Sequence, residues 1–119
     1  MIELAPHRKQ GLSLANPIIA ASGSVGCAHE ASDLIALDRL GALVTSPISL
    51  RPRQGVAQPR LSELSSGLLL RHGSQNPGWQ RALERFGAAW ARSPAPIIIH
   101  IAGQASDMLE LAKRIEGVT

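Results

Sequence analysis

The chain has little cysteine, few aromatic residues and no long apolar run. Its 119 residues include one cysteine, no tyrosine, one phenylalanine and two tryptophans. The lone cysteine, Cys27, excludes an internal disulfide framework and fits a reducing compartment. No apolar run approaches the roughly 20 residues of a membrane helix, and Met1–Gln10 contains no secretory apolar region. We therefore expect a cytoplasmic protein without a membrane partner.

Charge and motif content exclude several function classes. Twelve basic residues oppose nine acidic ones, and the densest basic stretch, Arg51, Arg53 and Arg60, contains no aromatic side chain for base stacking. We therefore expect no nucleic-acid partner. Cys27 and His29 stand far from the other histidines in the sequence and predict no metal site. No motif typical of hydrolases occurs.

The sequence alternates apolar runs with helical patterns. Ile97–Ile99 is β-branched throughout, whereas Trp79, Leu83, Phe86 and Trp90 form one stripe of a helix. Together the patterns predict strands at 18–21, 42–45 and 97–101, and helices that start near Ser32, Asn76-Pro77 and Ser106, the first and last ending at Gly41 and Gly117. This order predicts an α/β fold with a parallel sheet, either a Rossmann-like open sheet or part of a (β/α) barrel.

Candidate ligand-binding segments follow from this fold class. In both architectures, ligands bind beyond the carboxyl ends of the strands. The segments at those ends are 21–26, 46–49 and 100–103. The insert 47–75 is long for a loop between a strand and a helix, and such loops are usually functional.

Two motifs in and after the insert are the most specific in the chain: Pro52-Arg53-Gln54-Gly55 and Gln75-Asn76-Pro77-Gly78. Further segments of the same pattern occur, in order, at 11–18, 21–23, 40–42, 48–51, 58–60, 66–69 and 96–98. On these segments the sequence resembles the class 1 dihydroorotate dehydrogenases, especially the type 1B catalytic subunit. The resemblance implies the N-terminal part, about three βα units, of a TIM (β/α)8 barrel with a long insert after the second strand. Residues 1–119 are then a partial FMN-dependent barrel domain that stops before the fourth strand.

The resemblance also implies an activity, a cofactor and a partner. The family binds FMN and oxidises dihydroorotate, a small pyrimidine, to orotate in de novo pyrimidine biosynthesis. A base removes a proton from one ring carbon while a hydride passes from its neighbour to the flavin. In type 1B, the electrons leave through an electron-transfer subunit that carries FAD and an iron–sulfur cluster. The oligomeric state stays open.

Site residues follow from the resemblance position by position. The expected cofactor contacts are Ala21, Ser22 and Gly23, then Ser46 with Pro47 at the position of the family's lysine, and His100 at that of a flavin-contacting asparagine. The expected substrate contacts are Ser46, Leu70, Arg71, His72, Gly73 and Ser74.

The differences from the family pattern leave the activity open. Ser46 supplies no charge, and Leu70 replaces an asparagine amide that contacts the pyrimidine. The family's catalytic cysteine lies in a loop after the fourth strand, so that no catalytic residue is expected within 1–119, and Cys27 does not substitute for it. The alternatives are an enzyme with another substrate, a copy that decays without selection, or a non-catalytic module that needs another chain to complete the barrel.

Overall fold

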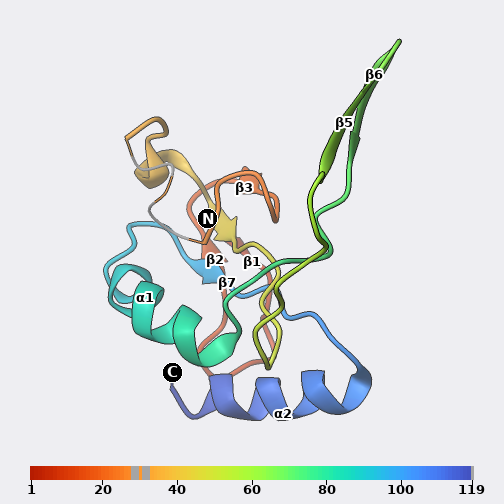
Figure 1. Ribbon diagram of the computed structural model, residues 1–119. Coiled ribbons are helices and arrows are strands. Elements are labelled where there is room, and N and C mark those ends of the chain that lie inside the picture. Colours follow the sequence, from red (N-terminus) through yellow and green to blue (C-terminus); the bar gives the residue numbers. More distant parts are fainter. Residues whose placement is uncertain (28–29, 31–32, 119) are drawn as a thin grey trace. The chain divides into compact units, whose positions relative to one another are not determined.

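The computed structural model describes residues 1–27, 30 and 33–118 (Figure 1). The chain divides into two compact units, each built from two stretches of sequence. Unit 1 comprises Met1–Pro47 and Leu83–His100, and unit 2 comprises Ile48–Ala82 and Ile101–Thr119. Each unit has its own buried side chains and hydrogen bonds.

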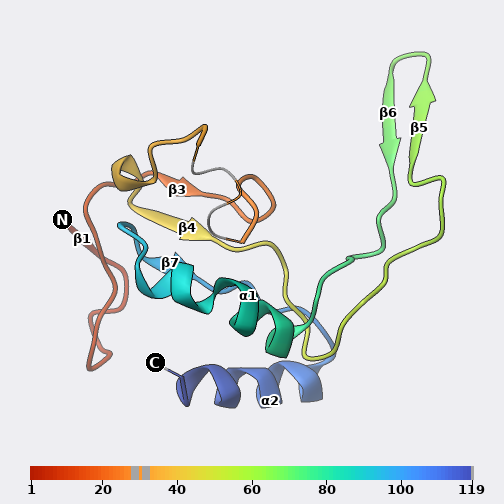
Figure 2. The same cartoon turned by 60° about the vertical axis from the view of Figure 1, so that its left-hand side comes forward.

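A parallel sheet of three strands forms the centre of unit 1. Its order is β3 (Ile19–Ala20), β4 (Ala42–Val44) and β7 (Ile97–Ile98), with β4 in the middle. Figure 2 shows the three strands side by side and running in the same direction. Ala42 and Leu43 in the middle strand are at most 1% exposed, as expected for a strand covered on both faces.

The predicted α/β class with a parallel sheet is confirmed. Each strand that the apolar runs predicted is present, although each is shorter than predicted. The described residues form no closed barrel.

An antiparallel hairpin that was not predicted lies at the N-terminus. β1 (Ile2–Glu3) pairs with β2 (Ser13–Leu14). The Glu3 carboxylate accepts hydrogen bonds from the Ser13 hydroxyl and the Leu12 N–H, both at 2.6 Å. These bonds, with the Ser13 hydroxyl as the largest cause, lower the pKa of Glu3 below its ordinary value. Two-residue strands are too short to show a hydrophobic period, so no sequence pattern marked them.

The helix predicted from Ser32 to Leu40 is wrong for the residues that the structure describes. Ser32 lies outside them, and from 33 to 40 the only helical turn is the 3-10 turn η1 (Leu37–Arg39). Leu34 is 87% exposed and Ile35 is 37% exposed, whereas Leu37 and Leu40 are half-buried, so the four apolar side chains do not form one buried helical face. A helix this short needs such packing, because its own hydrogen bonds barely offset the cost of nucleation.

The helix predicted around the tryptophans is confirmed as α1 (Trp79–Ala91). Trp79 and Phe86 are at most 4% exposed, whereas Leu83 and Trp90 are half-buried. The four side chains therefore serve packing, as their spacing predicted.

The turn before α1 belongs to unit 2 and is built around Asn76. The Asn76 Oδ1 atom accepts hydrogen bonds from the N–H groups of Gly78 at 3.0 Å and Ser49 at 3.1 Å. The Ser49 carbonyl in turn accepts the N–H of Trp79 at 2.9 Å. Gly78 adopts a φ of +77°, so the helix begins at Trp79, and the predicted start near Asn76-Pro77, with Pro77 in the first turn, is wrong by two residues.

The second helix, α2 (Ala105–Glu116), buries Leu111 completely and ends at Gly117 as predicted. Its N-cap is Gln104, and Ser106, near which the sequence predicts the start of the helix, lies inside the first turn. No helix in the described part of the chain is long and apolar enough to cross a membrane.

The insert 47–75 contains a hairpin that was not predicted. β5 (Leu61–Leu64) pairs antiparallel with β6 (Gly67–Leu70), and Figure 1 shows the strands running side by side to their turn. Every residue of both strands is exposed. Five leucines, the largest side chains on this exposed hairpin surface, are Leu61, Leu64, Leu68, Leu69 and Leu70.

Candidate functional site

Three polar residues meet where the strands of the unit 1 sheet end. Ser22 follows β3, Thr45 follows β4 and His100 follows β7. The Ser22 hydroxyl lies 2.8 Å from the Thr45 carbonyl oxygen and 2.7 Å from Nδ1 of His100. The backbone N–H of His100 donates to the Thr45 hydroxyl at 3.0 Å. We call these three residues the strand-end cluster; they occupy the edge at which α/β proteins bind ligands.

The strand-end cluster is anchored in the core and has an open turn beside it. Thr45 is fully buried, Ser22 and His100 are half-buried, and Ala21 and Gly23 are exposed. Gly23 has a φ of +86°, and a Cβ atom built there would meet no atom within 4 Å. The turn therefore leaves room for a flat group to approach the backbone.

The rest of this edge is held by backbone hydrogen bonds. The hydroxyl and N–H of Ser24 both donate to the Ala21 carbonyl, at 2.6 and 3.1 Å, and close the turn around Ser22. The Ser46 N–H donates to the Gly26 carbonyl at 3.0 Å. Ser46 and its neighbour Pro47 are half-buried, and no described residue hydrogen-bonds the Ser46 hydroxyl. All predicted cofactor contacts thus belong to unit 1, and their roles toward a ligand stay predictions.

Cys27 is buried and its thiol is free. Its carbonyl accepts the indole N–H of Trp90 at 2.6 Å. Burial raises the pKa of the Cys27 thiol, and the charge of Glu30 raises it further. A thiol with a raised pKa forms little thiolate at neutral pH, which agrees with a structural role.

A metal centre has no support within residues 1–27, 30 and 33–118. No three histidine, cysteine, aspartate or glutamate side chains among them are grouped so that they could hold a metal ion. His29, which the sequence placed beside Cys27, lies outside the described residues.

The predicted substrate segment, 70–74, belongs to unit 2. Leu70 ends β6 and is 64% exposed. The backbone of the segment is tied to residues 55–60, because Arg71 N–H donates to the Arg60 carbonyl at 2.7 Å and the His72 carbonyl accepts the Val56 N–H at 3.3 Å. Gly73 and Ser74 both have positive φ angles, +67° and +54°. The backbone is thus held while the side chains of the segment are exposed.

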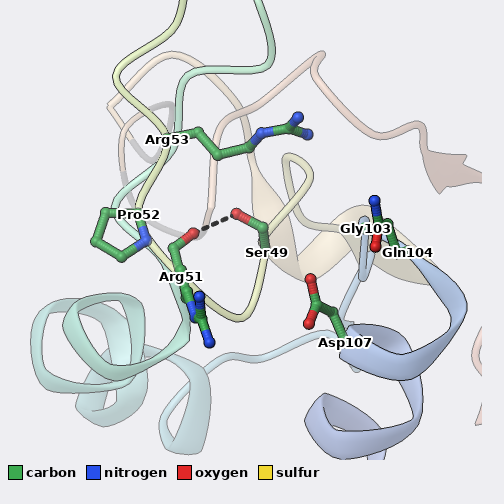
Figure 3. Close-up of a pocket in the computed structure, with 7 residues that line it drawn as sticks. All are labelled: Ser49, Arg51, Pro52, Arg53, Gly103, Gln104 and Asp107. Atoms are coloured by element: carbon green, nitrogen blue, oxygen red, sulfur yellow. Dashed lines mark hydrogen bonds between the residues drawn. The ribbon is translucent and has the colours of Figure 1, made fainter.

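Unit 2 also contains a polar cavity of about 500 Å³, a volume typical of small-molecule sites. The residues that line it are Ser49, Arg51, Pro52, Arg53, Gly103, Gln104 and Asp107. Figure 3 shows the Asp107 carboxylate pointing from the first turn of α2 toward the Ser49 loop, while the guanidinium groups of Arg51 and Arg53 extend in different directions. The two arginines and one aspartate in this lining suit a small polar molecule that carries an acidic group.

Sequence reasoning missed the organising residues of both units. The sequence predicts Asn76 only at the start of a helix, whereas in the structure it also holds the Ser49 loop against the start of α1. The sequence predicts Thr45 only as the last residue of a strand, whereas it hydrogen-bonds both Ser22 and His100. Asp107 had no motif around it.

Comparison with known proteins extends these observations. A family profile described as dihydroorotate dehydrogenase matches residues 7–119. Three similar proteins, from Desulforudis audaxviator, Endomicrobium trichonymphae and Bacillus pumilus, are each named dihydroorotate dehydrogenase B (NAD(+)), catalytic subunit.

These relatives are 39%, 39% and 41% identical to the chain over 109, 104 and 106 residues. The matched regions cover 91%, 87% and 88% of this chain but 36%, 34% and 34% of the relatives. The chain therefore spans about a third of the length of the curated relatives that it matches.

Proposed function

The chain belongs to the dihydroorotate dehydrogenase family, and we propose that it forms the flavin-facing first part of an oxidoreductase that converts dihydroorotate to orotate in pyrimidine biosynthesis. The strand-end cluster is the observation that carries the proposal, because three parallel strands bring hydrogen-bonded polar groups to one edge. In this proposal, residues 1–119 supply about three βα units of a (β/α)8 barrel domain, and the β5–β6 hairpin is the insert after the second barrel strand.

The residues at this edge fit one side of the FMN ring system. The open space at Gly23 admits a flat ring, and Ser46 and His100 supply polar groups at the ends of the neighbouring strands. We assign FMN binding to Ala21, Ser22, Gly23, Ser46, Pro47 and His100. When bound, FMN would accept the hydride from the substrate. The residues of this chain would bind and orient the ring, and Thr45, which is fully buried, would hold His100 in place.

Substrate and electron transfer form the second part of the proposal. We assign contacts with the pyrimidine substrate to Ser46 and to residues 70–74. The relatives are catalytic subunits by name, so we also propose an electron-transfer partner subunit carrying FAD and an iron–sulfur cluster. The catalytic base is not assigned to this chain, because Cys27 is buried and its pKa is raised.

Fluorescence titration of the protein with FMN tests the proposal. We expect saturable quenching of flavin fluorescence, and weaker binding after Ser22→Ala or His100→Ala, since both replacements break the strand-end cluster. His7→Ala is the matched control, because His7 is an exposed histidine of unit 1 outside the site. Absence of FMN binding, or equal weakening by His7→Ala, would refute the assignment of this edge to the flavin.

A second candidate function is supported by the exposed leucines of β5 and β6. Monomeric proteins rarely expose a large apolar patch without a role, so we propose as the alternative a non-catalytic module that needs another chain to complete the barrel, with a second copy of the chain covering the hairpin. Light scattering distinguishes the two. If the protein self-associates, and the replacements Leu68→Ser and Leu70→Ser abolish this self-association, the result supports the module. A monomeric protein that binds FMN supports the oxidoreductase.

A further inference from the structure

We propose that His100 is locked as the Nδ1–H tautomer, so that its Nε2 lone pair accepts a hydrogen bond from the imide N–H of a uracil-type ring. This deepens the proposed function, on which it rests for the place of the ligand. The inference is based on the geometry around the Ser22 hydroxyl. This hydroxyl lies within hydrogen-bond distance of two groups but has only one proton to donate.

The proton count at Ser22 determines the tautomer. A serine hydroxyl donates one hydrogen bond, and the Thr45 carbonyl 2.8 Å away can only accept. If Ser22 donates to that carbonyl, the His100 Nδ1 atom at 2.7 Å must carry the hydrogen and donate to the Ser22 oxygen. The opposite arrangement would place the Ser22 oxygen against the Thr45 carbonyl with no hydrogen between them. It would also leave that part-buried carbonyl without a side-chain donor among the described residues.

The backbone of His100 is held as well. Its N–H donates to the hydroxyl of Thr45, which is fully buried, at 3.0 Å. The ring is therefore fixed at its root by Thr45 and at Nδ1 by Ser22. The tautomer of a histidine is set by the hydrogen bond that one ring nitrogen makes.

The remaining ring nitrogen defines the ligand chemistry. A neutral imidazole with a proton on Nδ1 has a lone pair on Nε2, and no described residue hydrogen-bonds Nε2. Such an atom suits an N–H donor and disfavours a carbonyl oxygen. An imide N–H lies between two carbonyl groups that polarise it, and it is therefore a strong donor. Both the pyrimidine-type ring of a flavin and orotate carry this group.

Nitrogen-15 NMR of the histidine side chains tests the tautomer directly. We expect the neutral His100 ring of the free protein to give the signals of a protonated Nδ1 and an unprotonated Nε2. Ser22→Ala removes the acceptor of the Nδ1 proton, and we expect the proton to move to Nε2. The signals are assigned by their loss in His100→Asn, with His7→Asn as control. A proton on Nε2 in the unchanged protein would overturn the inference.

Four ligands test the hydrogen bond at Nε2: FMN, N3-methyl-FMN, orotate and N3-methyl-orotate. We expect one or both parent compounds to shift the Nε2 signal, and the N-methyl counterpart to bind about tenfold or more weakly, the usual effect of losing one such bond. His100→Asn keeps a short side chain that can still donate to Ser22 but has no atom at the Nε2 position. We therefore expect this variant to bind the parent compounds and their N-methyl counterparts with equal affinity.

The ligand experiments distinguish this inference from the proposed function. FMN binding with no Nε2 shift from FMN or orotate, and with equal affinity for N3-methyl-FMN, overturns the inference and leaves the flavin site intact. An orotate-induced shift in a protein that binds no FMN supports the inference and overturns the flavin assignment. A protonated Nδ1 with no Nε2 shift from either parent compound overturns the ligand assignment.

Discussion

Replacing Asn76 with alanine tests how strongly this residue holds the Ser49 loop, which lines the cavity of unit 2. The Asn76 Oδ1 atom accepts the N–H groups of Ser49 and Gly78, and its Nδ2 atom donates to the Ser74 carbonyl at 2.9 Å. The Ser49 hydroxyl also approaches Oδ1, at 3.0 Å, but its single proton has a closer acceptor, the Arg51 carbonyl at 2.6 Å. Asn76→Ala therefore removes two part-buried acceptor bonds and one exposed donor bond.

The magnitude follows from these three bonds. A buried N–H that loses its acceptor costs about 1–3 kcal/mol. Both N–H groups are only part-buried, which places each near the lower end of that range. The exposed bond to Ser74 contributes about 0.5 kcal/mol, because water replaces it. We therefore expect Asn76→Ala to lower the free energy of unfolding by about 2–4 kcal/mol.

Urea denaturation followed by circular dichroism measures this loss. Asn76→Asp is the matched control, because it keeps an oxygen that accepts both N–H groups and loses only the donor to Ser74. We expect the aspartate variant to stay within about 1 kcal/mol of the unchanged protein. Equal losses in the two variants, or a loss below about 0.5 kcal/mol in Asn76→Ala, would refute the role of Oδ1 as the organiser of this turn.

Three further predictions concern unit 1 and the hairpin. Gly41→Ala should destabilise the protein by about 2 kcal/mol or more in thermal melts, because its Cβ would collide with the Asn16 carbonyl oxygen, whereas Gly67→Ala, with no atom within 4 Å, should stay within about 0.5 kcal/mol. The hydrogen bonds to the Glu3 carboxylate lower its pKa in the folded protein, so they add stability above the ordinary value of about pH 4.5. This stability is lost as the pH falls from about 4.5 through the lowered pKa, because the carboxylate becomes protonated. Melts across that window should show the decline, and its persistence in Glu3→Gln would contradict this cause. Cys27 should react slowly with iodoacetamide at neutral pH and faster on denaturation, because burial raises its pKa; equal rates would contradict its burial.

The strands of the sheet and α1 were predictable because each has a strong local signal. The isoleucines of β7 are β-branched, and the tryptophan stripe has the period of a helix. The segment 33–40 had a similar apolar period but forms only η1, since Leu34 and Ile35 are exposed. Periodicity reports which side chains could share a face; whether that face is buried depends on contacts distant in sequence.

The hairpins and the cavity had no local signal that could predict them. Strands β5 and β6 carry leucines on both faces, so the alternation typical of a half-buried strand is absent. The cavity joins Arg51 and Arg53 to Asp107, which lies more than fifty positions later in the chain. Such a site depends on long-range folding, and a single sequence contains no direct information on that proximity.

The strand-end cluster shows where prediction from sequence reaches its limit. Ser22, Ser46 and His100 were placed at strand ends correctly, yet the partner that β4 contributes to the observed hydrogen bonds is Thr45. Successive side chains of an extended strand point to opposite faces, so a difference of one residue decides which of them meets the neighbouring strand. That choice depends on the parallel register between β4 and β7. Because the Thr45 hydroxyl fixes the backbone of His100, and no ligand contact is assigned to Thr45, replacing Thr45 should weaken ligand binding at Nε2 of His100 through His100 alone.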